Sequence, residues 1–278
     1  MKRLHAALLG SLSLAVMALP VQAATTTATK PATAEKAAPA ATTEEHHVDP
    51  KATAALERMG AYLRTLKDFE IKVYSTTEDV LESGQKIQTS NQVHYVVQAP
   101  NKLLAEVSGD KLKRHYYYDG KTFTSRNNQD DFYAQVPYTG SLTQLFTDIE
   151  VKYGIEMPLQ DLFRWGHPDA DVAQPYEGIV VGDSKIGEWD TDHYAFRQDG
   201  VDFQIWIEKG DKPLPRKLVI NSLADEAQPM YSAVINWDLN PKIDPAGFTF
   251  VPGADSKRIP FMTPEVYAAA TAAKKAAK

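Results

Sequence analysis

The most regular pattern in the chain is an alternation of apolar and polar residues between positions 201 and 207. Val, Phe, Ile and Ile occupy the odd positions, Asp and Gln occupy positions 202 and 204, and Trp206 is an amphipathic exception. Successive side chains of a β-strand point to opposite faces, so this run predicts a strand with one apolar face. The dipeptide Asp199-Gly200 predicts a two-residue hairpin turn of type I′. Residues 189–222 are therefore predicted to form an antiparallel meander.

The same period of two recurs in the first half of the chain, between residues 69 and 136. Turn signals rich in Gly, Pro, Asn and Asp separate these runs about every ten residues, which is typical of antiparallel strands. A βαβ arrangement would place a helix between successive strands, and this spacing leaves no room for one. Six strands are expected here, and residues 178–182, 231–239 and 248–250 are predicted to add further strands to the second meander.

Three amphipathic segments are predicted to be helices, one before the strand pattern and two between the meanders. Asp49 and Pro50 form a helix start, and the apolar residues that follow up to Leu66 recur at helical spacing. Between the two meanders, Ser141 and Gln144 form a capping box, and an apolar stripe continues to the helix stop at Gly154. A second short helix is predicted over 158–165. Helices inserted between two meanders must lie over an apolar face of the sheet or close its mouth.

These elements predict a mainly β (α+β) fold. We expect a curved antiparallel incomplete barrel of about 10–11 strands, with helices covering the concave face. Residues 49–261 are predicted to form this single domain, and residues 262–278 an Ala/Lys-rich tail. An all-β domain of this length is commonly a single unit.

The first 48 residues carry signals of export. A charged start, a short apolar run and small residues before Ala24 predict a signal peptide over residues 1–23, cleaved near Ala23. Residues 24–48 are rich in Ala, Thr and Pro and are predicted to be a disordered linker. We therefore expect a periplasmic protein.

The composition of the chain excludes several kinds of functional site. The chain has no cysteine, which excludes disulfides, thiol nucleophiles and thiolate metal sites. Its formal net charge is −6, without the clustered positive charge that nucleic-acid binding requires. No nucleophile elbow, phosphate-binding loop or zinc motif is present. No nucleic-acid partner and no cofactor are therefore expected.

Three clusters contain groups that could bind a metal ion: residues 46–47, 167–171 and 190–193. Alternating Asp residues in loops more often cap turns and stay solvated, so no metal site is expected. A structural hydrogen bond is also the more usual role for His193 at the start of a strand. The least favoured hypothesis is an enzyme that uses Asp192 and His193 as acid and base.

Several segments resemble a family of predicted periplasmic proteins of unknown function. They are residues 192–197 (DHYAFR), 200–208 (GVDFQIWIE), 210–220 (GDKPLPRKLVI), 99–102 (APNK) and 118–121 (YDGK). That family is similar to the LolA-like and LolB-like lipoprotein carriers and to mycobacterial glycolipid carriers. The resemblance implies an incomplete barrel whose helices plug an apolar cavity that receives acyl chains. The polar residues by which the carriers position a lipoprotein have no matching motif here.

We therefore expect non-catalytic binding or carriage of a lipid, an acyl chain or a lipidated protein. The alternative is an envelope sensor that reports lipid to a membrane-protein partner. The helix after Ser141 is expected to act as a movable plug through Leu142, Leu145, Phe146 and Ile149. Apolar strand residues are expected to line the cavity: Phe69, Ile71, Val73, Tyr116, Tyr118, Phe203, Ile205, Ile207, Leu218 and Ile220.

A charge within the plug tests this expectation. The substitution Phe146→Asp should abolish lipid binding without unfolding the sheet, because it opposes burial of the plug against an apolar ligand. Lipid uptake and far-ultraviolet circular dichroism would be measured on the same sample. Uptake equal to that of the parent protein would contradict the plug assignment.

Overall fold

The computed structural model describes residues 47–110, 113–167, 174–266, 268–269 and 272. The predicted signal peptide over residues 1–23 lies outside the described residues. So do residues 24–46 of the predicted linker.

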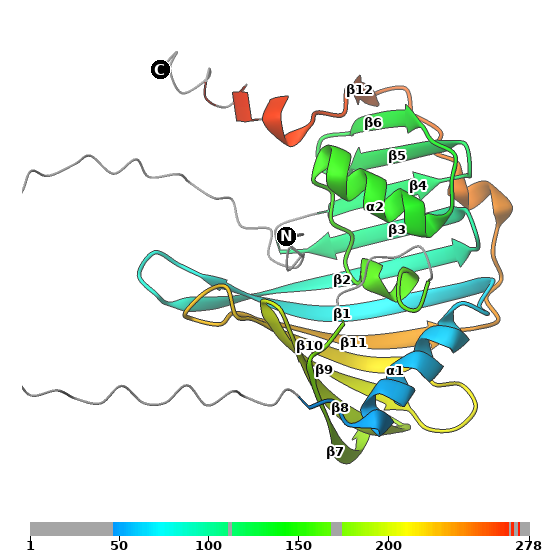
Figure 1. The fold of residues 1–278 in the computed structure, drawn as a ribbon. Helices are drawn as coiled ribbons and strands as arrows, with labels where there is room; N and C mark the ends of the chain where they lie inside the picture. Colours follow the sequence, from blue (N-terminus) through cyan, green and yellow to red (C-terminus); the bar gives the residue numbers. More distant parts are fainter. Residues whose placement is uncertain (1–46, 111–112, 168–173, 267, 270–271, 273–278) are drawn as a thin grey trace, which may run out of the picture.

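The fold is mainly β, as predicted, and is built on one open curved sheet of 12 strands (Figure 1). The strand order is β12-β6-β5-β4-β3-β2-β1-β11-β10-β9-β8-β7. Neighbouring strands are antiparallel except β12, which runs parallel to β6. The bounds are β1 (Asp68–Val80), β2 (Lys86–Gln98), β3 (Lys102–Gly109), β4 (Lys113–Tyr118), β5 (Thr122–Asn127), β6 (Phe132–Pro137), β7 (Glu177–Ile186), β8 (Trp189–Gln198), β9 (Val201–Glu208), β10 (Pro215–Ser222), β11 (Met230–Asp238) and β12 (Lys257–Ile259).

Two meanders share this sheet and meet at one pair of strands. Strands β1 to β6 follow one another outward from β1, and strands β7 to β11 return toward it. The joint is the antiparallel pairing of β1 with β11, which runs from Glu70 opposite Asp238 to Thr77 opposite Tyr231. Hydrogen bonds between segments far apart in sequence thus make the two apolar faces continuous.

The helices lie over the concave side of the sheet (Figure 1). Helix α1 (Pro50–Leu63) starts where predicted, because the Asp49 carboxylate accepts a hydrogen bond from the Lys51 amide at 2.8 Å. Helix α2 (Leu142–Tyr153) has the predicted capping box of Ser141 with Gln144. It ends at Gly154, whose φ of 63° is the left-handed conformation that glycine adopts without strain. The short helix expected over 158–165 is a 3₁₀ turn, η1 (Gln160–Phe163).

The turn before β9 differs from the prediction. Gln198 pairs with Val201, so the hairpin loop has the expected two residues. A type I′ turn requires positive φ at both of them. Gly200 has a φ of 80°, whereas Asp199 is not among the described non-glycine residues with positive φ. The turn is therefore not type I′, and the aspartate keeps an ordinary backbone conformation.

The strand predicted over 248–250 is wrong. Residues Pro245–Phe248 form a 3₁₀ turn, η2, and the last strand is β12. The segment crosses the convex face, where the Phe250 ring lies 5.4 Å from that of Tyr117 and 4.9 Å from that of Tyr133. Two aromatic residues separated by one position give the same pattern in a strand as at the end of a 3₁₀ turn that crosses a sheet, so periodicity does not distinguish the two cases.

Burial of Phe248 on the convex face can be tested by truncation. The side chain is 1% exposed, so Phe248→Ala should lower the free energy of unfolding by about 3–5 kcal/mol through lost burial and a residual cavity. The matched control is Val251→Ala, because Val251 is 80% exposed and its truncation should change stability by about 0.5 kcal/mol or less. Urea unfolding measures both variants. Equal stability of the two would show that the crossing segment does not pack on the sheet.

Candidate functional site

The concave face of the sheet forms one apolar cluster with the helices that cover it. All the strand residues predicted to line a cavity belong to this cluster, except Ile220, which is half-buried against it. The four predicted plug residues of α2 are buried in the same cluster. The structure therefore brings these residues together, with the α2 stripe packed directly onto the concave face.

Phe163 is the central contact between the helices and the sheet. Its ring lies 4.9 Å from Phe146 of α2, 5.6 Å from Tyr95 of β2 and 6.3 Å from Phe69 of β1. The Tyr95 hydroxyl donates a hydrogen bond to the Pro158 carbonyl at 2.5 Å. We call residues 141–165, which include α2 and η1, the cap. The cap is held to the sheet mainly by apolar and aromatic packing, which is non-directional.

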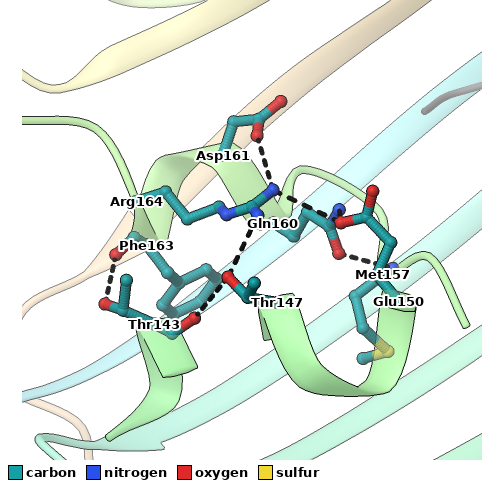
Figure 2. A network of polar contacts seen from close by, with 8 residues as sticks. All are labelled: Thr143, Thr147, Glu150, Met157, Gln160, Asp161, Phe163 and Arg164. Atoms are coloured by element: carbon teal, nitrogen blue, oxygen red, sulfur yellow. Dashed lines mark hydrogen bonds and ion pairs between the residues drawn. The ribbon is translucent and has the colours of Figure 1, made fainter. Parts of the chain in front are cut away.

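A polar network ties the two parts of the cap together (Figure 2). The Gln160 side-chain Nε2 donates a hydrogen bond to Glu150 Oε2 at 2.7 Å, and Arg164 Nη1 lies 3.3 Å from the same oxygen. Arg164 Nη2 donates to the Thr147 hydroxyl at 3.0 Å. We call Thr147, Glu150, Gln160 and Arg164 the latch. Polar groups shielded from water require such partners, so the latch fixes η1 against one side of α2.

Hydrogen bonds also anchor the start of the cap. The Tyr118 hydroxyl donates to the Gly140 carbonyl at 2.7 Å and accepts from the Gly140 amide at 3.0 Å. The Leu142 amide donates to the Pro100 carbonyl at 2.8 Å. Tyr138 donates to the Asp148 carboxylate at 2.9 Å, and burial together with this bond raises the pKa of its phenol. The start of α2 is thus fixed to the sheet.

A cavity of about 550 Å³ opens where the concave face meets the end of α2. Ser125 and Ala134 form part of its floor, and Ser125 pairs with Tyr116 across the sheet, so these side chains share the concave face. The C-terminal segment crosses above this floor. The lining residues are Arg114, Ser125, Asn127, Phe132, Ala134, Tyr153, Gly154, Ile155, Ile259, Pro260, Phe261, Met262, Thr263 and Pro264.

A smaller cavity of about 60 Å³ lies between α2 and strands β5 and β6. Tyr153 lines both cavities, and its ring stacks on Phe261 at 4.7 Å. The predicted plug residue Ile149 lines the smaller cavity as well. The smaller cavity thus lies along the last turns of α2, and the larger one lies at its C-terminal end.

Sequence reasoning did not find the larger cavity. Its charged residue, Arg114, lies two positions before Tyr116 and therefore on the same face of β4, so the alternation in 114–118 carried that signal. Nothing in the local pattern around Phe261 indicates that this ring returns to the concave side and stacks on Phe123 at 5.8 Å.

Comparison with protein-family models identifies the family of the chain. The model of the family described as "Predicted periplasmic protein (DUF2092)" matches residues 52–262. The chain belongs to this family. The match spans both meanders of the DUF2092 protein, the cap and part of the C-terminal segment over the larger cavity. A comparison with curated proteins finds no match.

Several solved structures are similar to this DUF2092 protein. An uncharacterized conserved protein from Thermus thermophilus has a TM-score of 0.44 at 11% identity, covering 76% of this chain and 99% of that one. The Mycobacterium tuberculosis lipoprotein LppX has a TM-score of 0.42 at 12% identity, covering 70% and 100%. A LolA superfamily protein from Nitrosomonas europaea has a TM-score of 0.32 at 11% identity, covering 72% and 97%.

The structure separates Asp192 from His193. His193 stacks on Trp206 on the convex face at 3.9 Å, its Nε2 lies 3.0 Å from the Gln204 amide oxygen, and burial lowers its pKa. Asp192 points to the opposite face and pairs with Lys209 at 3.3 Å. The two side chains are therefore not placed to act together as acid and base.

The other clusters singled out in the sequence are only partly described. His46, Asp169 and Asp171 lie outside the described residues, and Asp190 pairs with Lys185 at 3.5 Å. Across the described ranges, no three His, Asp or Glu side chains are grouped closely enough to hold a metal ion. None of the helices among the described residues combines the length and apolar character that crossing a bilayer requires.

The latch can be tested apart from the apolar packing. Phe146 is fully buried, so Phe146→Asp would bury a charge and destabilise the cap directly. The substitution Arg164→Met instead removes the cation and keeps the stem, leaving Glu150 without one partner. We expect hydrogen exchange of the α2 amides to quicken by a factor of about 5–150, which corresponds to roughly 1–3 kcal/mol for an unpaired polar group.

Lys152→Met is the matched control for this measurement. Lys152 lies on the same helix and pairs with Asp148 at 3.6 Å, but both side chains are largely exposed, so the pair contributes little. Exchange of the α2 amides should therefore match that of the parent protein. Equal exchange in both variants would show that the latch does not hold α2.

Proposed function

We propose that this DUF2092 protein binds an acyl chain, lipid or lipidated protein non-catalytically in the periplasm. The ligand enters at the open end of the concave face and lies between the sheet and the cap. The strand residues that line the covered face, with Ile149 and the other buried residues of α2 opposite, are the inner wall of this site.

The observation that carries the proposal is the pair of cavities beside α2. The larger one, at about 550 Å³, falls within the range of 300–1,000 Å³ found for small-molecule sites. Its walls are mostly apolar, and Tyr153 lines both this cavity and the smaller one beneath α2. The mostly apolar walls of the larger cavity suit a flexible hydrocarbon chain.

The energetics support the same ligand class. Each CH₂ group removed from water stabilises a complex by about 0.8 kcal/mol. Beneath the cap the concave face is already filled by side chains such as Phe146 and Phe163, so a long chain must displace the cap in part. Apolar contacts between cap and sheet can be exchanged for contacts with an acyl chain at small net cost, because they are non-directional.

The proposed compartment rests on the N-terminal pattern and on the family. Residues 1–23 carry the features of a secretory signal, and the family is described as predicted periplasmic. The absence of cysteine leaves the folded domain independent of disulfide formation.

The first test is native mass spectrometry of the protein purified from periplasm without detergent. We expect a discrete adduct that organic extraction recovers as a lipid, and uptake of one fluorescent fatty acid by the stripped protein. A clean mass of the protein alone, with no uptake of added lipid, would overturn the proposal.

Two substitutions on α2 then test where the ligand binds. Ile149→Phe adds volume inside the smaller cavity, and we expect uptake to weaken about tenfold, equal to roughly 1.4 kcal/mol. Val151→Phe adds the same kind of bulk to a residue that is 75% exposed, and uptake should not change. Equal uptake by both variants, with unchanged thermal unfolding, would place the ligand away from α2.

A further inference from the structure

The larger cavity combines apolar walls with a single charge. Among the described residues that line it, Arg114 alone carries a formal charge at neutral pH. Ser125 and Asn127 lie beside it on the neighbouring strand β5, where Asn127 is the direct cross-strand partner of Arg114. Apart from Thr263 on the C-terminal segment and the Tyr153 hydroxyl, the polar side chains of the lining therefore lie over β4 and β5.

The opposite side of the cavity is mostly apolar, with Thr263 as the polar side chain of the C-terminal segment. Ile259, Phe261 and Met262 come from the C-terminal segment, and Ile155 from the connection that follows α2. The Phe261 ring is held between Tyr153 and Phe123, at 4.7 and 5.8 Å. A ligand in this space thus meets hydrogen-bond donors at one end and hydrocarbon along the rest.

The charge of Arg114 remains available to a ligand. Its guanidinium lies within hydrogen-bonding reach of the Tyr116 hydroxyl. Burial raises the pKa of the Tyr116 phenol and outweighs the lowering by the nearby guanidinium. Tyr116 is therefore a neutral partner that orients the guanidinium without cancelling its charge.

We infer that the cavity selects a single-chain amphiphile with an anionic head group, of the fatty-acid class. The carboxylate lies against Arg114 and Asn127, and the hydrocarbon chain runs past Phe261 and Tyr153 toward α2. This inference rests on the proposed function and adds the class of ligand to it.

Charge complementarity favours this ligand over the other amphiphiles. A guanidinium donates two parallel hydrogen bonds to a carboxylate, and such charge-assisted bonds are about twice as strong as neutral ones. A neutral ester would fill the cavity but leave the arginine charge without a counter-ion. A cationic amphiphile would place its positive head group beside the guanidinium, and the two charges would repel. The apolar walls strengthen the ion pair because they exclude water.

The experiment compares palmitate with methyl palmitate, which has the same chain and no charge. Binding of each to the stripped protein is measured by isothermal titration calorimetry. We expect the parent protein to prefer palmitate about tenfold or more, equal to at least roughly 1.4 kcal/mol. Arg114→Met should remove the preference by weakening palmitate alone, and Arg114→Lys should retain part of it.

Two further variants complete the test. Lys113→Met removes a neighbouring exposed charge on the opposite face of β4, and the preference for palmitate should stay as in the parent protein. Ala134→Phe fills the floor of the cavity, and it should weaken both ligands. Thermal unfolding of every variant separates lost binding from lost folding.

The outcomes distinguish this inference from the proposed function. Equal affinity of the parent protein for acid and ester, unchanged in Arg114→Met, would overturn the anionic selectivity and leave lipid binding in place. Binding of both ligands to Ala134→Phe with parent affinity would place the ligand outside this cavity and would also overturn the inference. Binding of neither ligand to the parent protein would overturn both.

Discussion

The pairing of β1 with β11 is the constraint on which the rest of the structure depends. Each meander alone is a sheet with one apolar face. Joined along residues 70–77 and 231–238, they become a single curved surface whose apolar side is concave. A continuous apolar face of this size must be covered, because exposed apolar surface is unfavourable in water. The chain supplies α1 before the first meander and the cap between the two.

The cover combines two kinds of interaction with different physical properties. Packing of Phe163 and the α2 stripe on the sheet is non-directional, whereas the latch among Glu150, Gln160 and Arg164 depends on geometry. Under the proposed function, contacts of the first kind would be exchanged for contacts with an acyl chain, whereas the second kind holds α2 and η1 together as one unit. Because hydrogen bonds fix the start of α2 to the sheet, the proposed ligand would be accommodated by movement of the rest of the cap.

The C-terminal part of the chain links the two faces of the sheet. It crosses the convex side at Phe248 and Phe250, adds β12 to the outer edge and returns to the concave side at Phe261. This path places apolar residues above strands β4 to β6, where the cap ends. The larger cavity therefore exists because the sheet edge, the end of α2 and the returning segment meet without filling the space between them.

The sequence by itself determined the elements whose causes are local. Alternation predicted the two meanders, the Asp49 and Ser141 caps predicted where the long helices begin, and Gly154 predicted where α2 ends, whereas α1 ends at Leu63, before the predicted Leu66. The apolar strand positions and the α2 stripe were also predicted to face one another, and they share one cluster. Each of these signals depends on residues within one strand or one helical turn.

Only the tertiary structure decided the rest. The crossing of Phe248 and Phe250, the parallel pairing of β12 and the meeting of Arg114 and Phe261 at one cavity depend on which surfaces meet. Apolar residues separated by one position give the same pattern whether their segment pairs in a sheet or crosses one. Periodicity therefore assigns a side chain to a face, and packing between distant segments decides whether that face is filled or left open as a cavity.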